Sequence, residues 1–377
     1  MAVTYMMAGR SVDNASLYRR LGVSLGDPAV WIDAGSRRIA MVRDLEMDRT
    51  RAAGRVDEVT TPAKYEPPSG LSGDRETAMA QAAANLLRKL RRDTVTVDRT
   101  LPFIYAWHLD QAEIEVRYDA ELGVRDRRQK SAAEIESLRA AQSVTEDVMR
   151  LLCTRIARAG VNDHGELMHE GEVLTSDHIR RAAAIEFMSR SFSMSHGAIC
   201  ASVPQAGDCH HAGEGTLRTG VPIILDLFPR DDASLYWGDC TRTVVHGTIN
   251  ERVARMHAAV VAAKRAATAA LVPGATGEAV HRASTDVLIE AGYVESRGTI
   301  TDGASIQHGT GHGIGLELHE PILLDNGGGE ILSGEVFTVE PGLYGRDDGG
   351  VRVEDMIVAT ADGPMNLNRL PEGLDWS

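Results

Sequence analysis

Three histidines within twelve residues form the densest group of side chains that could do chemistry. His308, His312 and His319 lie in the segment His308–Glu320, with four glycines among them. Imidazole is a common metal ligand that titrates near neutral pH, and glycine lets the backbone approach another group closely. Apolar residues at every second position from Ile314 to Leu318 predict a half-buried strand. Buried histidines need polar partners, so we looked for carboxylates that could share a site with them.

Two pairs of acidic residues have nearly equal spacing. Asp226 ends an apolar run, and Asp239 follows a polar turn 13 residues later, at the start of a second strand. Glu340 likewise ends an apolar run, and Glu354 lies 14 residues later on the returning strand Val351–Val358. The sequence therefore predicts two hairpin-like units that each present two acids. Four acids and one histidine at one point would hold two divalent metal ions, roughly 3.5–4 Å apart, that activate a shared water.

Composition narrows the class of protein. A chain of 377 residues is long enough for two domains. Its formal net charge of -14 argues against nucleic-acid binding through a basic surface. The four cysteines show no metal-binding or disulfide spacing, so we expect reduced thiols and a cytoplasmic location. No apolar stretch reaches the length of a spanning helix and no signal-peptide pattern is present, so we expect no membrane partner.

The first third of the chain alternates between short strand patterns and helical ones. This alternation predicts a small α/β domain over residues 1–128. Its expected strands cover 29–33, 38–43, 94–97 and 114–117, and its clearest expected helix covers 76–90. We found no group of catalytic residue types in this part.

The remainder, residues 129–377, begins with a helix signal. Ser131 and Glu134 form a capping-box pattern, and the apolar stripe behind it predicts a helix that ends before Gly160. Further helices are expected over 176–188, after Asn250, and over 278–290. A strand hairpin, two helices and a second hairpin predict an α+β fold with some internal symmetry.

Taken together, these residues resemble a known family. Residues 129–377 resemble the catalytic domain of the pita-bread metallopeptidases, which include Xaa-Pro aminopeptidase, Xaa-Pro dipeptidase (prolidase) and methionine aminopeptidase. The N-terminal part resembles the creatinase-like extra domain of the Xaa-Pro members. The matching pieces occur in the family's order and are Asp226, Asp239–Thr243, Gly311–Gly315 with His319–Glu320, Thr338–Gly342 and Val351–Asp355.

The resemblance implies a set of metal ligands. Asp239 and Glu354 are expected to bridge two divalent ions. One imidazole among four carboxylates suits Mn²⁺, Co²⁺, Zn²⁺ or Fe²⁺, and the oxygen-rich set favours Mn²⁺. The implied ligands are Asp226, Asp239, His312, Glu340 and Glu354.

The resemblance also implies catalytic residues. Glu340 would accept and relay a proton from the bridging water. His319 would hydrogen-bond the scissile peptide or the tetrahedral oxyanion. His210 matches a further histidine on the loop before the first acidic strand, and its neighbour His211 stays an alternative.

Two more residues are expected to bind the substrate. His308 would line the substrate pocket, and Arg352 would share a strand face with Glu354 and orient carboxylates. The sequence departs from the family pattern in two places; the first is expected to change a loop and not the ligands, and the second bears on the substrate. The hairpin between the first two acids is two residues longer and contains Phe228–Arg230, and Cys209 stands where many Xaa-Pro members have proline.

The implied function is hydrolysis of Xaa-Pro bonds at the N-termini of short peptides, by attack of a metal-bridging hydroxide. The sequence leaves aminopeptidase and dipeptidase open, and a homodimer is expected from the resemblance. The alternative is a non-peptidase on the same fold, an amidinohydrolase or a metal-dependent lyase acting on a small molecule. Amidinohydrolases of this fold have lost metal ligands, so the presence of all five ligands argues against that function. A lyase would keep the metal, so the ligands do not exclude it.

Overall fold

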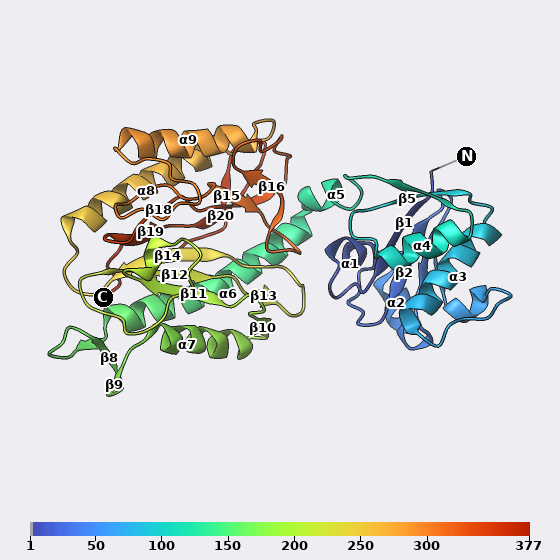
Figure 1. Cartoon of the computed structure of the whole chain (residues 1–377), viewed down its shortest axis with the longest axis horizontal. Coiled ribbons are helices and arrows are strands. Elements are labelled where there is room, and N and C mark those ends of the chain that lie inside the picture. Colours follow the sequence, from blue (N-terminus) through green and yellow to red (C-terminus); the bar gives the residue numbers. More distant parts are fainter. Residues whose placement is uncertain (1–2) are drawn as a thin grey trace. The chain divides into compact units, whose positions relative to one another are not determined.

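The computed structural model describes residues 3–377, which divide into two compact units after Arg127. Figure 1 labels their elements. Among the described residues, no helix combines the length and the apolar character that crossing a bilayer requires.

The N-terminal unit is built on a six-stranded mixed sheet with the order β4-β3-β2-β1-β5-β6. Its strands are β1 (Tyr5–Gly9), β2 (Ala29–Asp33), β3 (Arg38–Met41), β4 (Glu58–Thr60), β5 (Thr94–Val97) and β6 (Glu115–Tyr118). Its helices are α1 (Ala15–Leu21), α2 (Met47–Ala53), α3 (Arg75–Lys89) and α4 (Phe103–Gln111). The strands and the helix expected here are confirmed, with ends that differ by one or two residues.

Both faces of the central strands β1, β2 and β3 are buried because these strands are apolar at nearly every position rather than at alternate ones. Met6 and Ala8 pack into one core with α3 and α4, and Met7 packs into the other core with α1. Such continuous apolar runs are typical of strands that are covered on both sides.

The second unit carries the helices that the sequence predicted. Ser131 caps α6 (Ala132–Ala157), and the reciprocal bonds of a capping box join it to Glu134. A cap of this kind contributes about 1 kcal/mol to stability. A short helix, α5 (Arg125–Arg128), precedes α6. The other helices are α7 (Ser176–Met188), α8 (Glu251–Ala270) and α9 (Gly277–Glu290).

Two sheets of this unit form the frame of the site. One has the order β11-β12-β14, with β11 (Ala198–Ser202), β12 (Pro222–Leu227) and β14 (Cys240–Val245). The other has the order β16-β15-β17-β20-β21, with β15 (Gly311–Gly313), β16 (Glu320–Leu324), β17 (Val336–Val339), β20 (Asp355–Val358) and β21 (Met365–Asn366). The hairpin of β18 (Gly342–Gly345) and β19 (Gly349–Arg352) is a separate two-stranded sheet. Shorter strands complete the unit, namely β7 (Gly160–Val161), β8 (Leu167–His169), β9 (Glu172–Val173), β10 (Phe192–Ser193) and β13 (Arg230–Asp231).

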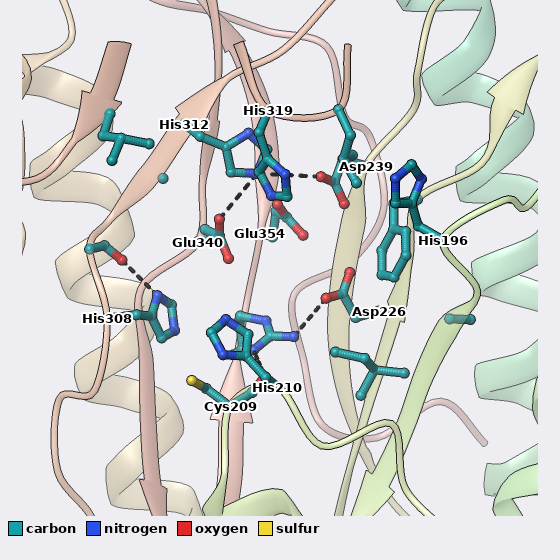
Figure 2. Close-up of a pocket in the computed structure, with 18 of the residues that line it drawn as sticks. His196, Cys209, His210, Asp226, Asp239, His308, His312, His319, Glu340 and Glu354 are labelled. Atoms are coloured by element: carbon teal, nitrogen blue, oxygen red, sulfur yellow. Dashed lines mark hydrogen bonds and ion pairs between the residues drawn. The ribbon is translucent and has the colours of Figure 1, made fainter. Parts of the chain in front are cut away.

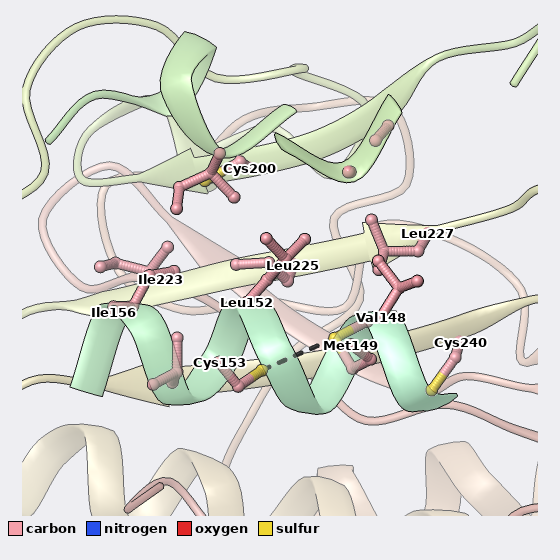
Figure 3. Close-up of a cluster of buried hydrophobic side chains, with 14 of the residues drawn as sticks. Val148, Met149, Leu152, Cys153, Ile156, Cys200, Ile223, Leu225, Leu227 and Cys240 are labelled. Carbon is pink, nitrogen blue, oxygen red and sulfur yellow. Dashed lines mark hydrogen bonds between the residues drawn. The ribbon is translucent and has the colours of Figure 1, made fainter. Parts of the chain in front are cut away.

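Helix α6 packs against β12 through a buried apolar cluster (Figure 3). Ile223, Leu225 and Leu227 of the strand all belong to this cluster. Because side chains alternate along a strand, Ile224 and Asp226 point to the opposite face. The packing of α6 therefore fixes the direction in which the first acid points.

The second sheet also has one strand face in a core and the other face directed away from it. Phe337 and Val339 of β17 lie in a core with residues of α8 and α9, so Thr338 and Glu340 face the other way. In Figure 1, α8 and α9 lie on one side of this unit and α6 and α7 on the other, with the strands between them. The polar faces of the two sheets are thus directed inward.

Two expectations about strands were wrong. The segment from Ile314 to Leu318 is an irregular loop, although its apolar side chains are buried. Its backbone is bonded outside a regular ladder, because Trp237 N–H donates to the Gly315 carbonyl (3.1 Å) and the nearby Glu320 Oε1 accepts from Leu316 N–H (3.1 Å). The returning strand expected over Val351–Val358 is interrupted between β19 and β20.

Candidate metal centre

A cavity of about 560 Å³ opens between the two sheets of the second unit. The implied metal ligands Asp226, Asp239, His312, Glu340 and Glu354 all line it, as do His210, His308, His319 and Arg352. His211 is not among the lining residues, and its Nδ1 instead accepts the N–H of Gly213 (2.9 Å). The structure therefore brings together residues that lie as far as 144 positions apart in the chain, from His210 to Glu354.

The five implied ligands come from both sheets. Asp226 lies in β12 and Asp239 directly precedes β14. His312 lies in β15, Glu340 directly follows β17, and Glu354 directly precedes β20. Because each acid lies at or near a strand end, the pairing of the strands fixes its backbone position, while its carboxylate reaches the cavity.

A pair of bonds joins the two sheets at the site. Thr241 Oγ1 donates to Glu354 Oε2 (2.7 Å), and Glu354 N–H donates to the Thr241 carbonyl (3.1 Å). Arg242, which is fully buried, also donates to the Glu354 carbonyl (2.6 Å) and to Asp355 Oδ1 (2.8 Å). These contacts hold Glu354 and the start of β20 against β14.

The ligand atoms converge on one point, and Figure 2 marks the contacts of His312 with Asp239 and Glu340. His312 Nε2 lies 3.7 Å from Asp239 Oδ2 and 3.5 Å from Glu340 Oε1. One ligand atom each from Asp239, His312 and Glu354 lies within 4.8 Å of the other two. Such spacing leaves room for a cation between groups that repel each other when they are charged.

Burial and mutual repulsion shift the pKa values of the acids upward. Burial first, and then the Glu354 carboxylate, raise the pKa of Asp239 well above its usual range. The pKa of Glu354 rises for the same reasons, with Glu340 as the main neighbour. Burial raises the pKa of Glu340 to about 7. A bound cation would oppose these upward shifts and favour the ionised carboxylates.

The histidine and the first aspartate fit the same conclusion. Burial and the neighbouring His319 lower the pKa of His312 to about 3, which leaves a neutral ring with a free lone pair. Asp226 Oδ2 accepts from Arg352 Nη2 (2.6 Å), but the buried Asp226 Oδ1 has no hydrogen-bond partner. A buried carboxylate oxygen without a donor is costly, and a divalent ion would satisfy it.

Sequence reasoning missed Tyr344, which does not line the cavity itself but contacts two residues that do, His308 and Arg352. The Tyr344 hydroxyl accepts from Arg352 Nη1 (2.9 Å) and lies 2.7 Å from His308 Nε2. A Cβ on Gly342 would lie 2.0 Å from this hydroxyl, so glycine there makes room for the ring. The alternation from Glu340 through Gly342 to Tyr344 was the available signal.

His196 is a second residue that was missed. It lines the cavity, and its ring meets Trp237 edge-on with centroids 5.1 Å apart. His319 lies close by, with its ring centroid 4.3 Å from that of His312. Burial and then His196 lower the pKa of His319. No spacing rule in the sequence links His196 to the other histidines.

Comparison with known proteins identifies the family. A family model described as metallopeptidase family M24 matches residues 136–361. The chain belongs to metallopeptidase family M24. Because this match covers more than half of the chain, the resemblance inferred from the motifs is confirmed.

Several curated proteins are similar to this M24 chain over part of their length. A probable dipeptidase PepE of Mycobacterium tuberculosis is 35% identical over 178 residues, which is 47% of this chain and 45% of that protein. Xaa-Pro aminopeptidase 1 of Streptomyces coelicolor is 31% identical over 236 residues, which is 55% of this chain and 47% of that protein. The chain thus matches about half the length of these relatives.

A solved structure extends the likeness to nearly the whole M24 chain. The Xaa-Pro dipeptidase from Bacillus anthracis superposes with a TM-score of 0.80, over 98% of this chain and 94% of that chain, at 21% sequence identity. The predicted fold, a pita-bread α+β domain preceded by a smaller α/β domain, is therefore confirmed. At this identity the likeness establishes the fold alone.

Proposed function

We propose that this M24 chain is a peptidase that uses two divalent metal ions to hydrolyse Xaa-Pro bonds at the N-termini of short peptides. The observation that carries the proposal is the convergence of three buried carboxylates, one partly buried carboxylate and one neutral imidazole in a cavity between two sheets. The names of its relatives, a probable dipeptidase and an Xaa-Pro aminopeptidase, support this substrate class.

The proposed ligands, which would hold the two ions between them, are Asp226, Asp239, His312, Glu340 and Glu354. Two divalent ions bound there would polarise a carbonyl and lower the pKa of water. Carboxylate oxygens outnumber nitrogens in this set, and sulfur is absent from it, so we expect Mn²⁺.

The side chains around the ligands have separate proposed tasks. Glu340, which accepts from Thr338 Oγ1 (3.3 Å), takes up the proton that hydrolysis releases and passes it on. His319 and His210 donate hydrogen bonds to the carbonyl oxygen as negative charge develops on it. His210 is preferred over His211 because it lines the cavity.

The substrate-binding residues lie along one wall. His308 and Arg352 hold the peptide backbone and orient carboxylates, while apolar lining residues accommodate the proline ring. These apolar residues include Ile199, Phe228 and Leu323. We further propose a cytoplasmic homodimer in which residues 1–128 form a creatinase-like domain and residues 129–377 form the catalytic domain.

The test is a set of three peptides, assayed with and without added Mn²⁺. They are a dipeptide Xaa-Pro, a tripeptide Xaa-Pro-Yaa, and a control tripeptide Xaa-Ala-Yaa. Cleavage of Xaa-Pro-Yaa but not of the control supports an aminopeptidase, and cleavage of Xaa-Pro alone supports a dipeptidase. Bound metal without cleavage of any peptide would favour the lyase and contradict the proposal.

A further inference from the structure

A turn beside the metal centre gathers a second set of metal-binding side chains. It follows the short 3-10 helix Gln205–Gly207 and is closed by His211 N–H, which donates to the Asp208 carbonyl (3.2 Å). Within it, Asp208 Oδ1 accepts the N–H of His210 (2.9 Å). One ligand atom each from Asp208, Cys209 and His210 lies within 4.8 Å of the other two.

The backbone of this turn is anchored at its centre. Cys209 N–H donates to Gln307 Oε1 (3.2 Å), and the Cys209 carbonyl accepts from Arg352 Nη1 (3.2 Å). Gln307 Nε2 also donates to the Gly207 carbonyl (2.7 Å). Both polar backbone groups of Cys209 are bonded to other segments, so the backbone that carries the three side chains is held in place. This restraint lowers the entropic cost of binding an ion.

The donor set differs in kind from that of the main centre. Sulfur, imidazole nitrogen and carboxylate oxygen suit Zn²⁺, which takes three protein ligands and an open fourth position. Tetrahedral zinc separates its ligand atoms by about 3.5 Å. The His210 side chain is exposed, so rotation of its ring can close the remaining gap. Cys209 and His210 both line the cavity (Figure 2).

We propose that Asp208, Cys209 and His210 form an additional site for a thiophilic divalent cation of the Zn²⁺ class, which regulates the neighbouring centre. When the ion binds, the Cys209 S–H bond breaks, the sulfur–metal bond forms, and the proton passes to solvent. The bound ion also engages His210 and so withdraws it from the substrate. This inhibitory consequence rests on the proposed function, whereas binding of the ion does not.

Cobalt is the probe that separates the two sites. Co²⁺ substitutes for zinc and gives a near-ultraviolet sulfur-to-cobalt charge-transfer band only where a thiolate is a ligand. None of the five residues of the main centre carries sulfur. Co²⁺ is therefore titrated into the metal-free full chain, and bound metal is counted at each step.

Cys209→Ser is the matched variant because the buried thiols Cys153, Cys200 and Cys240 stay in place. We expect wild type to bind one more equivalent of Co²⁺ than the variant, and the charge-transfer band to disappear in the variant. A wild type without the band, or a band that persists in Cys209→Ser, would overturn the proposal. Asp208→Asn, which keeps the thiol, should retain the band but require at least about tenfold more Co²⁺. Unchanged affinity in a folded Asp208→Asn chain would also count against the site.

Peptide hydrolysis then tests the regulatory step. With Mn²⁺ present, added Zn²⁺ should inhibit wild type at concentrations at least about tenfold lower than those that inhibit Cys209→Ser, each compared with its own uninhibited rate. Equal inhibition of both would contradict regulation through this turn. A chain that gives the charge-transfer band but cleaves no peptide would refute the proposed function while leaving the additional site intact.

Discussion

The hydroxyl of Tyr344 joins two side chains that we propose for substrate binding. It lies between His308 and Arg352, and Arg352 in turn donates to Asp226. The chain of contacts therefore runs from a substrate-binding residue to a proposed metal ligand. Networks of this kind set the orientation of ligands as well as their position.

Tyr344→Phe should reduce both catalysis and stability. The change removes an acceptor from the buried Arg352 N–H, which costs about 1–3 kcal/mol. We expect kcat/KM for an Xaa-Pro peptide to fall about tenfold, which corresponds to about 1.4 kcal/mol. Steady-state kinetics measure this, and the exposed Tyr118→Phe is the control. Equal activity of Tyr344→Phe and wild type would mean that the hydroxyl does not position Arg352.

At the residue scale, the sequence allowed the acids to be predicted but not their surroundings. Asp226 and Glu340 end apolar strands, and that local pattern is visible in the sequence. His196 lines the cavity beside Trp237, and Tyr344 contacts the lining residue His308, each through a pairing with a distant segment. Alternation from Glu340 could have suggested the strand face of Tyr344, but local spacing carries no information about the partners of either residue, so these contacts could be found only in the folded chain.

At the element scale, close packing of β15 on β17 determines where His312 lies. A Cβ on Gly311 would lie 2.0 Å from the Thr338 carbonyl oxygen. Gly311→Ala should push the two strands apart, cost about 1–3 kcal/mol, and lower peptide hydrolysis by more than tenfold. Denaturant unfolding and kinetics measure the two effects.

Gly373→Ala is the control for this change. A Cβ at that position would meet no atom within 4 Å, so the variant should behave as wild type. If Gly311→Ala kept full activity and stability, the strand packing would not be what holds His312.

A buried histidine on α9 should make stability depend on pH. His281 Nδ1 lies 2.9 Å from Thr310 Oγ1, and its Nε2 lies 2.5 Å from Arg297 Nη2. Burial lowers the pKa of His281, although Asp325 and Glu295 beside it oppose the shift. The unfolded chain, with a histidine pKa near 6.5, therefore takes up more protons as the pH falls below that value. Stability is lost in the same range.

His281→Gln keeps an acceptor for Arg297 but cannot titrate. We expect the loss of melting temperature between about pH 7.5 and pH 5.5 to be smaller in the variant than in wild type. Thermal melts across this range, at constant ionic strength, provide the measurement. If the melting temperature of the variant falls as much as that of wild type, the pKa of His281 is not lowered in the folded state.

The elements could be predicted where their signals are local. Helix α6 was recognised from the capping box at Ser131 and Glu134, and its apolar stripe matched the observed core. The loop from Ile314 to Leu318 was predicted wrongly as a strand. Its bonds come from Trp237 and Glu320, and the alternation of buried apolar residues mimics a strand.

At the scale of the whole molecule, metal binding should be linked to folding stability. Four carboxylates share one cavity, so Mn²⁺ should stabilise the folded chain by about 2.7 kcal/mol at 100 times its dissociation constant. For a unit of this size, that corresponds to a rise of roughly 5–10 °C in melting temperature. Differential scanning calorimetry with and without Mn²⁺ measures the shift.

Asp239→Asn is the matched variant for this linkage because it removes one charge with little change in shape. We expect the metal-free variant to be at least as stable as metal-free wild type, since repulsion within the cluster falls. Added Mn²⁺ should raise the melting temperature of Asp239→Asn much less than that of wild type. An equal shift in both proteins would mean that Mn²⁺ binds elsewhere.

The most direct measurement for the central claim is Xaa-Pro hydrolysis by the full chain after chelation and after reloading with Mn²⁺, with bound metal counted in the same samples. The proposal predicts no hydrolysis in chelated wild type, recovery as about two Mn²⁺ per chain are restored, and no recovery in Asp239→Asn. Full activity in the chelated protein, or recovery in Asp239→Asn, would contradict a metal centre built from these five residues.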